Sequence, residues 1–318
     1  MNFLVYLLFI VLEKIVPLFP LSFTRRIARL KGILFYYIIP IRKKTALQNV
    51  RLAFPGKNEE QVRAIVKYCY INVLIVITEF FYIPKLKLNA LKETFKISNP
   101  EIIKEKLKDG KGLILISAHF GNWELGAYAI GRICGEPLNV IVKEQSNTLV
   151  DKEINEIREV SLMEDGQTDN KMQDTRMQGN RMQGNRMQGN KMIDMRNSLR
   201  EVLTLLKENK IVAMLGDQAA PKENVKVNFF IKDVPTFEGT ARFAIKTGAA
   251  VLFGVPVRND DYSYAITFRE IDMNKYKEYN DQNVKALTQE HTNMLVEMIK
   301  ENPGHWLWFH KRFKNTAQ

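Results

Sequence analysis

The chain has 318 residues, of which 46% are hydrophobic, and a formal net charge of +12 from 47 Lys and Arg against 35 Asp and Glu. This length can bury a substantial core, and the ordinary hydrophobic content excludes a polytopic membrane protein. The positive charge indicates an anionic partner: nucleic acid, an anionic lipid surface or an acidic protein. Cys69 and Cys134 have no zinc-site spacing and suggest no disulfide framework, so both are expected in the core.

The N-terminal region alternates apolar runs with basic residues. Phe3–Leu12 is apolar but too short to cross a bilayer, which takes roughly 20 residues, and Pro17 and Pro20 interrupt the apolar run that follows. Ten basic residues and no acidic one lie from Lys14 to Lys57. Because large aliphatic side chains accompany these charges, the pattern favours an anionic lipid surface over nucleic acid.

Three interpretations of this region stay open: a tilted anchoring helix, a helix in the membrane plane, or a buried core helix. We expect residues 1–32 to anchor the chain to a membrane and residues 33–318 to form the folded domain. Under the positive-inside tendency, the domain would face the cytoplasm, because four basic residues follow the apolar part directly. They are Arg25, Arg26, Arg29 and Lys31.

Further along the chain, apolar periodicity predicts alternating helices and strands. Asn58 and Gln61 form a capping-box pattern at the start of a predicted helix over residues 58–82. Further helices are expected over residues 101–109, 125–133, 196–209, 237–247 and 283–301. Strands are expected over residues 112–117, 140–142, 211–215, 249–256 and 264–268. This alternation predicts an α/β fold with a mixed sheet flanked by helices.

One segment departs from the alternation. Residues 171–192 contain Arg-Met-Gln-Gly-Asn three times in succession, and a five-residue period matches neither a helix nor a strand. We interpret the segment from about residue 164 to residue 192 as an inserted low-complexity surface loop, mobile and dispensable. A basic, Met-rich lip that touches the membrane is the alternative.

The main chemical signal is Ser117-Ala-His119-Phe-Gly-Asn-Trp-Glu124. An apolar strand delivers His119 at its carboxyl end, where α/β folds place reactive groups. A turn could fold the carboxylate of Glu124 back onto the imidazole Nδ1–H, which would fix the tautomer and leave Nε2 free to accept a proton as a general base. The alternative is a structural histidine, with Glu124 as a carboxylate at a helix N-terminus.

This block resembles the His-x4-Asp/Glu motif of the lysophospholipid acyltransferase superfamily, and more narrowly that of the lipid A biosynthesis (lauroyl/myristoyl) acyltransferases. Other blocks, spread over nearly the whole chain, are similar to blocks of the same family. They are Gln48-Asn49-Val-Arg-Leu-Ala-Phe54-Pro55, Asn72 with Glu79, Asp217-Gln218, Asn228-Phe229-Phe230, Thr236 with Gly239 and Ala241, and Pro303-Gly-His-Trp-Leu-Trp308-Phe-His-Lys-Arg312.

The resemblance implies a glycerol-phosphate-acyltransferase-like fold, with His119 as general base and Glu124 as its orienting carboxylate. It implies transfer of a fatty acyl chain from an acyl-carrier-protein thioester to a hydroxyl of a lipid A precursor, an anionic glycolipid. The reaction would take place at the cytoplasmic face of the inner membrane, without a cofactor or metal. The acidic carrier protein would be a second use for the basic surface.

The resemblance also places substrate-binding residues at Asn122 and Gln218. Lys143 stands where the family usually carries Arg, with Asn147 four residues on. Lysine keeps the positive charge but loses bidentate geometry. Lys143 could bind an acceptor phosphate, offset oxyanion charge, or be a solvated lysine at a strand end.

Asp217 follows the predicted strand over residues 211–215. If that strand runs parallel to the one before His119, both residues reach the same sheet edge. Asp217 could then shape the acceptor pocket, support the histidine, or fill a capping or turn role.

The alternatives to this function come from the acceptor and from other classes of protein. Another lysolipid, such as a lysophospholipid or an aminolipid, could receive the acyl group. A non-catalytic membrane-binding protein would explain the N-terminus only, and a nucleic-acid binder the charge only. Without a Gly-x-Ser-x-Gly elbow or a cysteine near the motif, a covalent nucleophile is not indicated. No His-Glu-x-x-His cluster suggests a metal.

Overall fold

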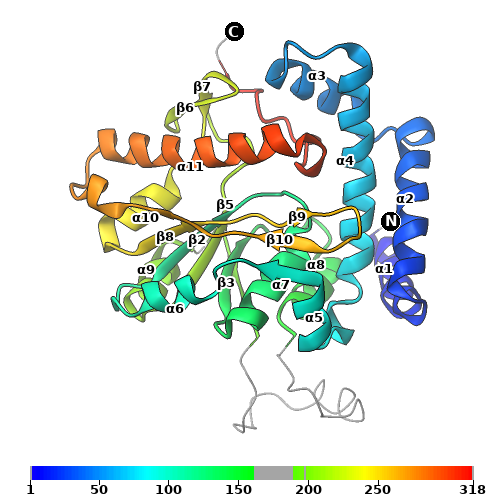
Figure 1. Cartoon of the computed structure of the whole chain (residues 1–318), viewed down its shortest axis with the longest axis horizontal. Coiled ribbons are helices and arrows are strands. Elements are labelled where there is room, and N and C mark those ends of the chain that lie inside the picture. The colour runs from blue at the N-terminus through cyan, green and yellow to red at the C-terminus, as the bar shows by residue number, and fades with distance from the viewer. Residues whose placement is uncertain (1, 161–188, 197, 317–318) are drawn as a thin grey trace, which may run out of the picture.

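The computed structural model describes residues 2–160, 189–196 and 198–316. Within these ranges the helical elements (Figure 1) are α1 (Asn2–Ile15), η1 (Val16–Leu18), α2 (Leu21–Ile38), α3 (Lys43–Ala53), α4 (Glu59–Phe80), η2 (Ile83–Lys85), α5 (Leu88–Thr94), α6 (Glu101–Leu107), α7 (Trp123–Cys134), α8 (Thr148–Arg158), α9 (Ser198–Lys207), α10 (Gly239–Thr247), η4 (Met273–Tyr276), α11 (Asp281–Glu301) and η5 (Pro303–His305). The strands are β1 (Phe95–Ile97), β2 (Leu113–Ser117), β3 (Leu138–Val142), β4 (Lys191–Asp194), β5 (Ile211–Leu215), β6 (Lys226–Phe229), β7 (Ile231–Pro235), β8 (Ala250–Phe253), β9 (Val257–Arg258), β10 (Tyr264–Ile266) and β11 (Arg269–Ile271).

A six-stranded sheet in the order β11-β8-β2-β5-β3-β4 forms the centre of the fold. The neighbouring strands from β8 to β4 pair in parallel, and only β11 is antiparallel to its neighbour. The predicted α/β fold with a mixed sheet is therefore confirmed. Because β2 and β5 are parallel, with Ser117 opposite Leu215, the residues that follow them leave the sheet at the same edge.

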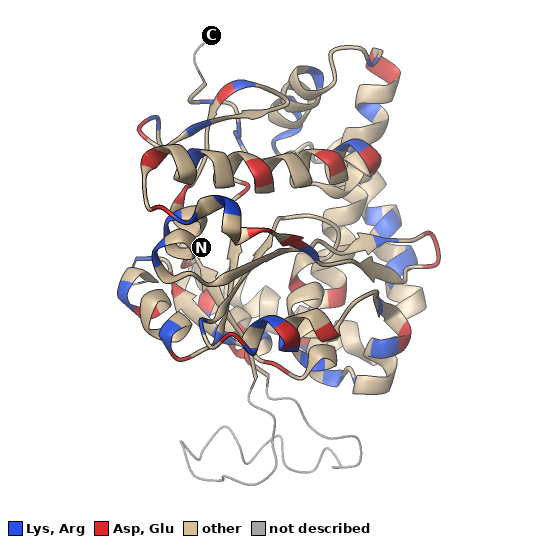
Figure 2. Ribbon diagram, turned by 60° about the vertical axis from the view of Figure 1, so that its left-hand side comes forward, with Lys and Arg blue, Asp and Glu red and all other residues tan. Residues whose placement is uncertain are grey.

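Helices cover both faces of this sheet, and the alternation along β2 shows why. Leu113 and Leu115 pack into a core with α5, α6 and α7, while Ile114 and Ile116 pack into the opposite core with α9, α10 and α11. Strands β2, β5 and β8 carry no charged residue. The charges lie mainly on the surrounding helices and loops (Figure 2). A strand buried on both faces is apolar throughout, as these are.

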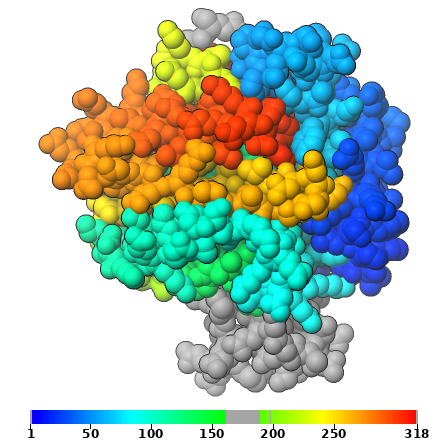
Figure 3. All heavy atoms as spheres, viewed as in Figure 1, coloured from blue at the N-terminus to red at the C-terminus, as the bar shows by residue number. Residues whose placement is uncertain are grey.

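The two N-terminal helices form one flank of the molecule (Figure 3). Helix α2 packs along α4 through Ala28 and Gly32, which are buried. Helix α1 has no buried residue and lies against α8, where the side-chain amide of Asn147 donates to the carbonyl of Asn2 at 2.8 Å. Its 14 residues extend only about 21 Å, less than the roughly 30 Å of a bilayer core.

Among the described helices, α4 alone has the length and apolar content to cross a membrane. Half of that span is buried inside the protein, between α2 and the body of the domain. Its first turn has the predicted capping box, in which Asn58 accepts from the Gln61 backbone and Gln61 accepts from the Asn58 backbone. Burial on this scale is typical of a core helix.

The structure differs from the sequence expectations in several elements. The predicted strand over residues 264–268 ends at Ile266, and this strand, β10, pairs with β1 and β9 in a separate three-stranded sheet. Helices α3, α5 and α8 and strands β1, β6, β7 and β11 were not predicted. Strand β4 begins at Lys191 and pairs Met192 with Val140, so the inserted loop is shorter than expected. The remaining repeats, in residues 171–188, lie outside the described residues.

Gly32 allows α2 to approach α4 closely, and a larger residue there should loosen the pair. A Cβ at Gly32 would lie 2.5 Å from the Cα of Ile71, a backbone contact that no rotamer change relieves. We expect Gly32→Val to lower the free energy of unfolding by about 1–3 kcal/mol, measured by denaturant titration. Leu30→Val, on the exposed face of the same helix, is the control and should change stability little. Equal stability of the two variants would contradict close α2–α4 packing.

Candidate active site

His119 and Asp217 meet at the edge of the sheet where β2 and β5 end. His119 Nδ1 lies 2.8 Å from Asp217 Oδ1, and the His119 backbone N–H donates to Oδ2 at 3.0 Å. The indole N–H of Trp306 donates to the same Oδ2 at 2.8 Å. An ionised carboxylate can only accept, so Nδ1 carries the proton and Nε2 is left with its lone pair. Of the interpretations open for Asp217, the geometry agrees with support of the histidine.

The expected contact between Glu124 and His119 Nδ1 is wrong, because Asp217 occupies that position. Glu124 lies in the first turn of α7, where Arg158 of α8 binds it in bidentate fashion. The distances are 2.8 Å from Nε to Oε2 and 2.6 Å from Nη2 to Oε1. The Trp123 indole N–H also donates to Oε1, at 3.2 Å. Glu124 therefore influences His119 through its charge and its ion pair, and not through a hydrogen bond to the ring.

The second ring nitrogen of His119, Nε2, faces polar and aromatic neighbours. The side-chain amide of Gln218 lies 3.3 Å from Nε2, and the ring of Trp123 lies 5.4 Å away between centroids. The His119 side chain is 20% exposed, whereas that of Asp217 is 2% exposed. The imidazole is thus accessible from outside while its partner is buried, as a general base requires.

Charge and burial act in opposite directions on the pKa values of this pair. Burial alone would lower the pKa of His119, but the negative charge of Asp217 and the hydrogen bond to it outweigh burial and raise the pKa above its ordinary value. Burial would raise the pKa of Asp217, but the charge of His119 and the hydrogen bonds from His119 and Trp306 lower it. Asp217 therefore stays ionised, and His119 becomes a neutral base only toward higher pH.

The turn after His119 is held by the C-terminal segment. The backbone N–H of Gly121 donates to the His305 carbonyl at 3.0 Å, and the Leu307 N–H donates to the His119 carbonyl at 3.0 Å. Gly121 has a φ of +56°, and a Cβ there would lie 1.8 Å from the carbonyl oxygen of Pro256. Only glycine fits this position, which explains the residue type at the turn.

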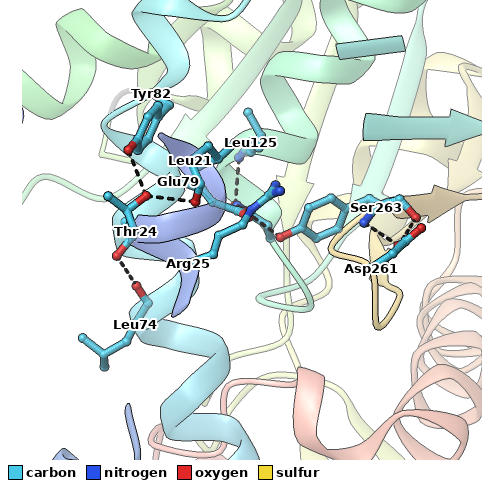
Figure 4. Close-up of polar contacts among 12 residues, drawn as sticks. Leu21, Thr24, Arg25, Leu74, Glu79, Tyr82, Leu125, Asp261 and Ser263 are labelled. Carbon is cyan, nitrogen blue, oxygen red and sulfur yellow. Dashed lines mark hydrogen bonds and ion pairs between the residues drawn. The ribbon is translucent and has the colours of Figure 1, made fainter. Parts of the chain in front are cut away.

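Asn122 is part of the scaffold of the turn. It is 0% exposed, its side-chain oxygen caps α7 by accepting from the Leu125 N–H at 3.0 Å, and its amide donates to Glu79 Oε2 at 2.6 Å. Glu79 also accepts from Arg25 at 2.6 Å and from the Tyr264 hydroxyl at 2.5 Å. Figure 4 shows Arg25 of α2 reaching Glu79 of α4. The expected substrate contact is therefore not available to the buried Asn122.

Lys143 and Asn147 lie on the segment after β3. Lys143 is exposed directly beyond the strand end. Asn147 caps α8 by accepting from the Val150 N–H at 3.4 Å, and its amide binds the backbone of α1. The polar groups of Asn147 are thus committed to the fold, and Lys143 is the residue of this pair that can reach a ligand.

Two residues of the early sequence blocks hold the C-terminal segment in place, a role that the linear sequence did not indicate. The amide of Asn49 donates to the carbonyls of Trp308 and His310 at 2.8 and 2.7 Å. The amide of Asn72 donates to the carbonyls of Gly121 and His305 at 3.0 and 3.2 Å. The available signal was the presence of polar residues at apolar helix positions, which indicates a buried partner.

The structure thus brings together an Asp–His pair at the carboxyl ends of two parallel strands, with no nucleophilic side chain among its contacts described above. The chain belongs to the bacterial lipid A biosynthesis acyltransferase family, whose model matches residues 1–164 and 166–315. It is 25% identical over 276 residues to the lipid A biosynthesis palmitoleoyltransferase of Escherichia coli (strain K12), covering 86% of this chain and 79% of that protein. The lipid A biosynthesis acyltransferase of Shigella flexneri shows the same identity and coverage. The protein is an acyltransferase.

The variants Asp217→Asn and Glu124→Gln should distinguish the roles of Asp217 and Glu124 in catalysis. An Asn amide facing Nδ1 disfavours the required tautomer, so we expect kcat to fall about 10³–10⁴-fold. Loss of the carboxylate charge should also move the acid limb of the kcat/KM profile to lower pH, because Asp217 raises the pKa of His119. Glu124→Gln should shift this limb less, since Glu124 does not bond to the ring. The measurement is a pH–rate profile of both variants, and near wild-type activity of Asp217→Asn would contradict the assignment.

Proposed function

We propose that the protein transfers a fatty acyl chain from an acyl-carrier-protein thioester to a hydroxyl of a lipid A precursor. His119 Nε2 removes the hydroxyl proton as the oxygen attacks the thioester carbonyl. The tetrahedral intermediate then collapses, its carbon–sulfur bond breaks, and the thiolate takes the proton from His119. The products are an ester and a free carrier thiol.

The observation that carries this proposal is the hydrogen bond between His119 Nδ1 and Asp217. It leaves one basic nitrogen, Nε2, on an accessible ring, which suits direct transfer without an acyl-enzyme. Family membership supplies the substrate class, since the matching family model is for lipid A biosynthesis acyltransferases. The names of both relatives refer to lipid A biosynthesis as well.

In this proposal, the ion pair of Glu124 and Arg158 stabilises charges that develop during the reaction. Arg158 lowers the pKa of His119 while Glu124 raises it, so the pair keeps the imidazole close to a useful basicity. The Arg158 side chain is 18% exposed, and its charge suits the oxyanion of the intermediate or a phosphate of the acceptor. Lys143, exposed beyond β3, is a second cation for an anionic acceptor.

The same proposal places the protein at an anionic membrane surface. Helices α1 and α2 expose a face of large apolar side chains, together with the basic residues Arg26, Arg29 and Lys31. The exposed apolar residues of the two helices are Phe3, Leu4, Val5, Leu7, Leu8, Val11, Ile15, Phe23, Leu30, Leu34, Tyr37 and Ile38. A patch of this composition suits an in-plane arrangement at the cytoplasmic face of the inner membrane. The surplus of basic charge also suits an acidic carrier protein.

His119→Ala should abolish acyl transfer because it removes the base. The assay supplies purified enzyme with acyl-carrier-protein and acyl-coenzyme A donors and with lipid A precursor or lysophospholipid acceptors, and identifies the product by mass spectrometry. We expect one added acyl group on the lipid A precursor with the carrier-protein donor, and at least 10²-fold less product with the variant. An unaltered melting temperature controls for folding. Full activity of His119→Ala would refute the mechanism, and acylation of the lysophospholipid alone would refute the acceptor.

Membrane binding should depend on the apolar face of α2. We expect the protein to float with vesicles that contain an anionic phospholipid, and less with neutral vesicles, because the helix combines apolar and basic residues. Leu30→Glu with Leu34→Glu should strongly reduce flotation. Leu199→Glu, at an equally exposed leucine of α9, is the matched control and should bind as wild type does. Equal binding of both variants would contradict this surface.

A further inference from the structure

A small cavity lies beside Asp217, and His119 is not among the residues that line it. Its volume is about 20 Å³, and its lining includes Asp217, Thr236, Thr240, His291 and Arg312. A space of this size holds one water molecule when several polar groups surround it. The cavity belongs to the interior, since Asp217 and Arg312 are both buried.

Two of the lining residues, His291 and Arg312, each have a buried polar atom without a hydrogen-bond partner among the described residues. The atoms are Nε2 of His291 and Nε of Arg312. Unpaired polar atoms in a protein interior cost free energy and in native structures are usually satisfied by ordered water. Burial and the charge of Arg312 lower the pKa of His291 to about 4, so this ring is neutral and contributes no charge near neutral pH.

Arg312 is held rigidly behind Asp217. One terminal nitrogen donates to the carbonyl of Pro235 and the other donates to the Thr236 hydroxyl at 2.6 Å. The guanidinium also lies over the ring of Phe229, 4.8 Å from its centroid. None of the salt bridges among the described residues involves Arg312, but Arg312 and Asp217 line the same cavity. Their opposite charges interact, although burial lowers the pKa of Arg312 more than Asp217 raises it.

We propose that Arg312 is a positioning residue for acyl transfer, which acts on Asp217 across a buried site for one water molecule shared with His291. The water donates to the carboxylate side of the cavity and accepts from Arg312 Nε, so that it relays the positive charge to Asp217. This inference rests on the proposed function, because it gives Asp217 its part in orienting His119.

The charges around the pair determine the sign of the effect. Glu124 and Arg158 face His119 from α7 and α8 and offset each other. From the C-terminal segment, His310 accepts a hydrogen bond from the Ala219 backbone at 3.2 Å, and its pKa is lowered, by burial first, so that it stays neutral. Among the residues that line the cavity, Arg312 is the one cation near neutral pH, since His291 is neutral. Removal of its charge should raise the pKa of His119, because a positive charge disfavours the imidazolium.

Arg312→Gln tests this effect on the pH dependence of transfer. We expect the acid limb of the kcat/KM profile to move up by about one pH unit, with KM for the acyl donor little changed. Arg312→Lys keeps the charge and should return the limb to its wild-type position. Thr236→Val removes a hydrogen-bond partner of Arg312 without removing the charge, and it controls for loosened packing. A wild-type limb in Arg312→Gln, or an equal shift in Thr236→Val, would overturn the inference.

A high-resolution crystal structure of the wild-type protein tests the water site even if Arg312→Gln does not fold. We expect density for one water within hydrogen-bond distance of both His291 Nε2 and Arg312 Nε. A cavity without density there would overturn the relay. This outcome can be told apart from failure of the proposed function. If His119→Ala is inactive and Arg312→Gln has a wild-type pH profile, His119 remains the base and only the role of Arg312 is refuted.

Discussion

The negative charge of Asp217 is the constraint on which the site depends. An ionised carboxylate is costly to bury unless it is paired and hydrogen-bonded, and here it receives N–H groups from the His119 ring, the His119 backbone and Trp306. These donors come from β2 and from the C-terminal segment. The carboxylate can therefore be held only when the parallel strands and that segment are all in place, and the reactivity of His119 depends on the same assembly.

A second buried carboxylate, Glu79, holds the turn on the other side. It is 0% exposed and joins Arg25 of the N-terminal helix α2 to Asn122 of the turn after His119. Helix α2 and the turn after His119 are therefore fixed to one side chain. Helix α2 carries the surface that we propose binds the membrane. The contacts of Glu79 therefore fix the position of the turn after His119 relative to that surface.

The sequence predicted the elements whose signals are local. The capping box of Asn58 and Gln61 and the apolar run of β2 depend on neighbouring residues, and both were found where expected. The partner of His119 was missed because the spacing to Glu124 is a local feature, whereas the position of Asp217 depends on the pairing of two parallel strands. Asn122 was expected to bind substrate. Its burial could not be foreseen, because it depends on helices and strands that are distant in the sequence. The sequence did identify Asp217 as a candidate, conditional on parallel strands.

The dependence of the site on tertiary contacts also explains why the family's sequence blocks are so far apart in the chain. Asn49, Asn72 and Arg312 do not contact the His119 ring, yet each binds the backbone of the turn, of the C-terminal segment or of the loop at Thr236. A base must be held within a fraction of an ångström of its working position, and this precision comes from buried hydrogen bonds behind the reactive groups. Polar residues scattered along apolar elements are therefore informative about an active site even when none of them reaches the substrate. In this chain they bind the turn after His119, the C-terminal segment that contacts this turn, and the loop at Thr236.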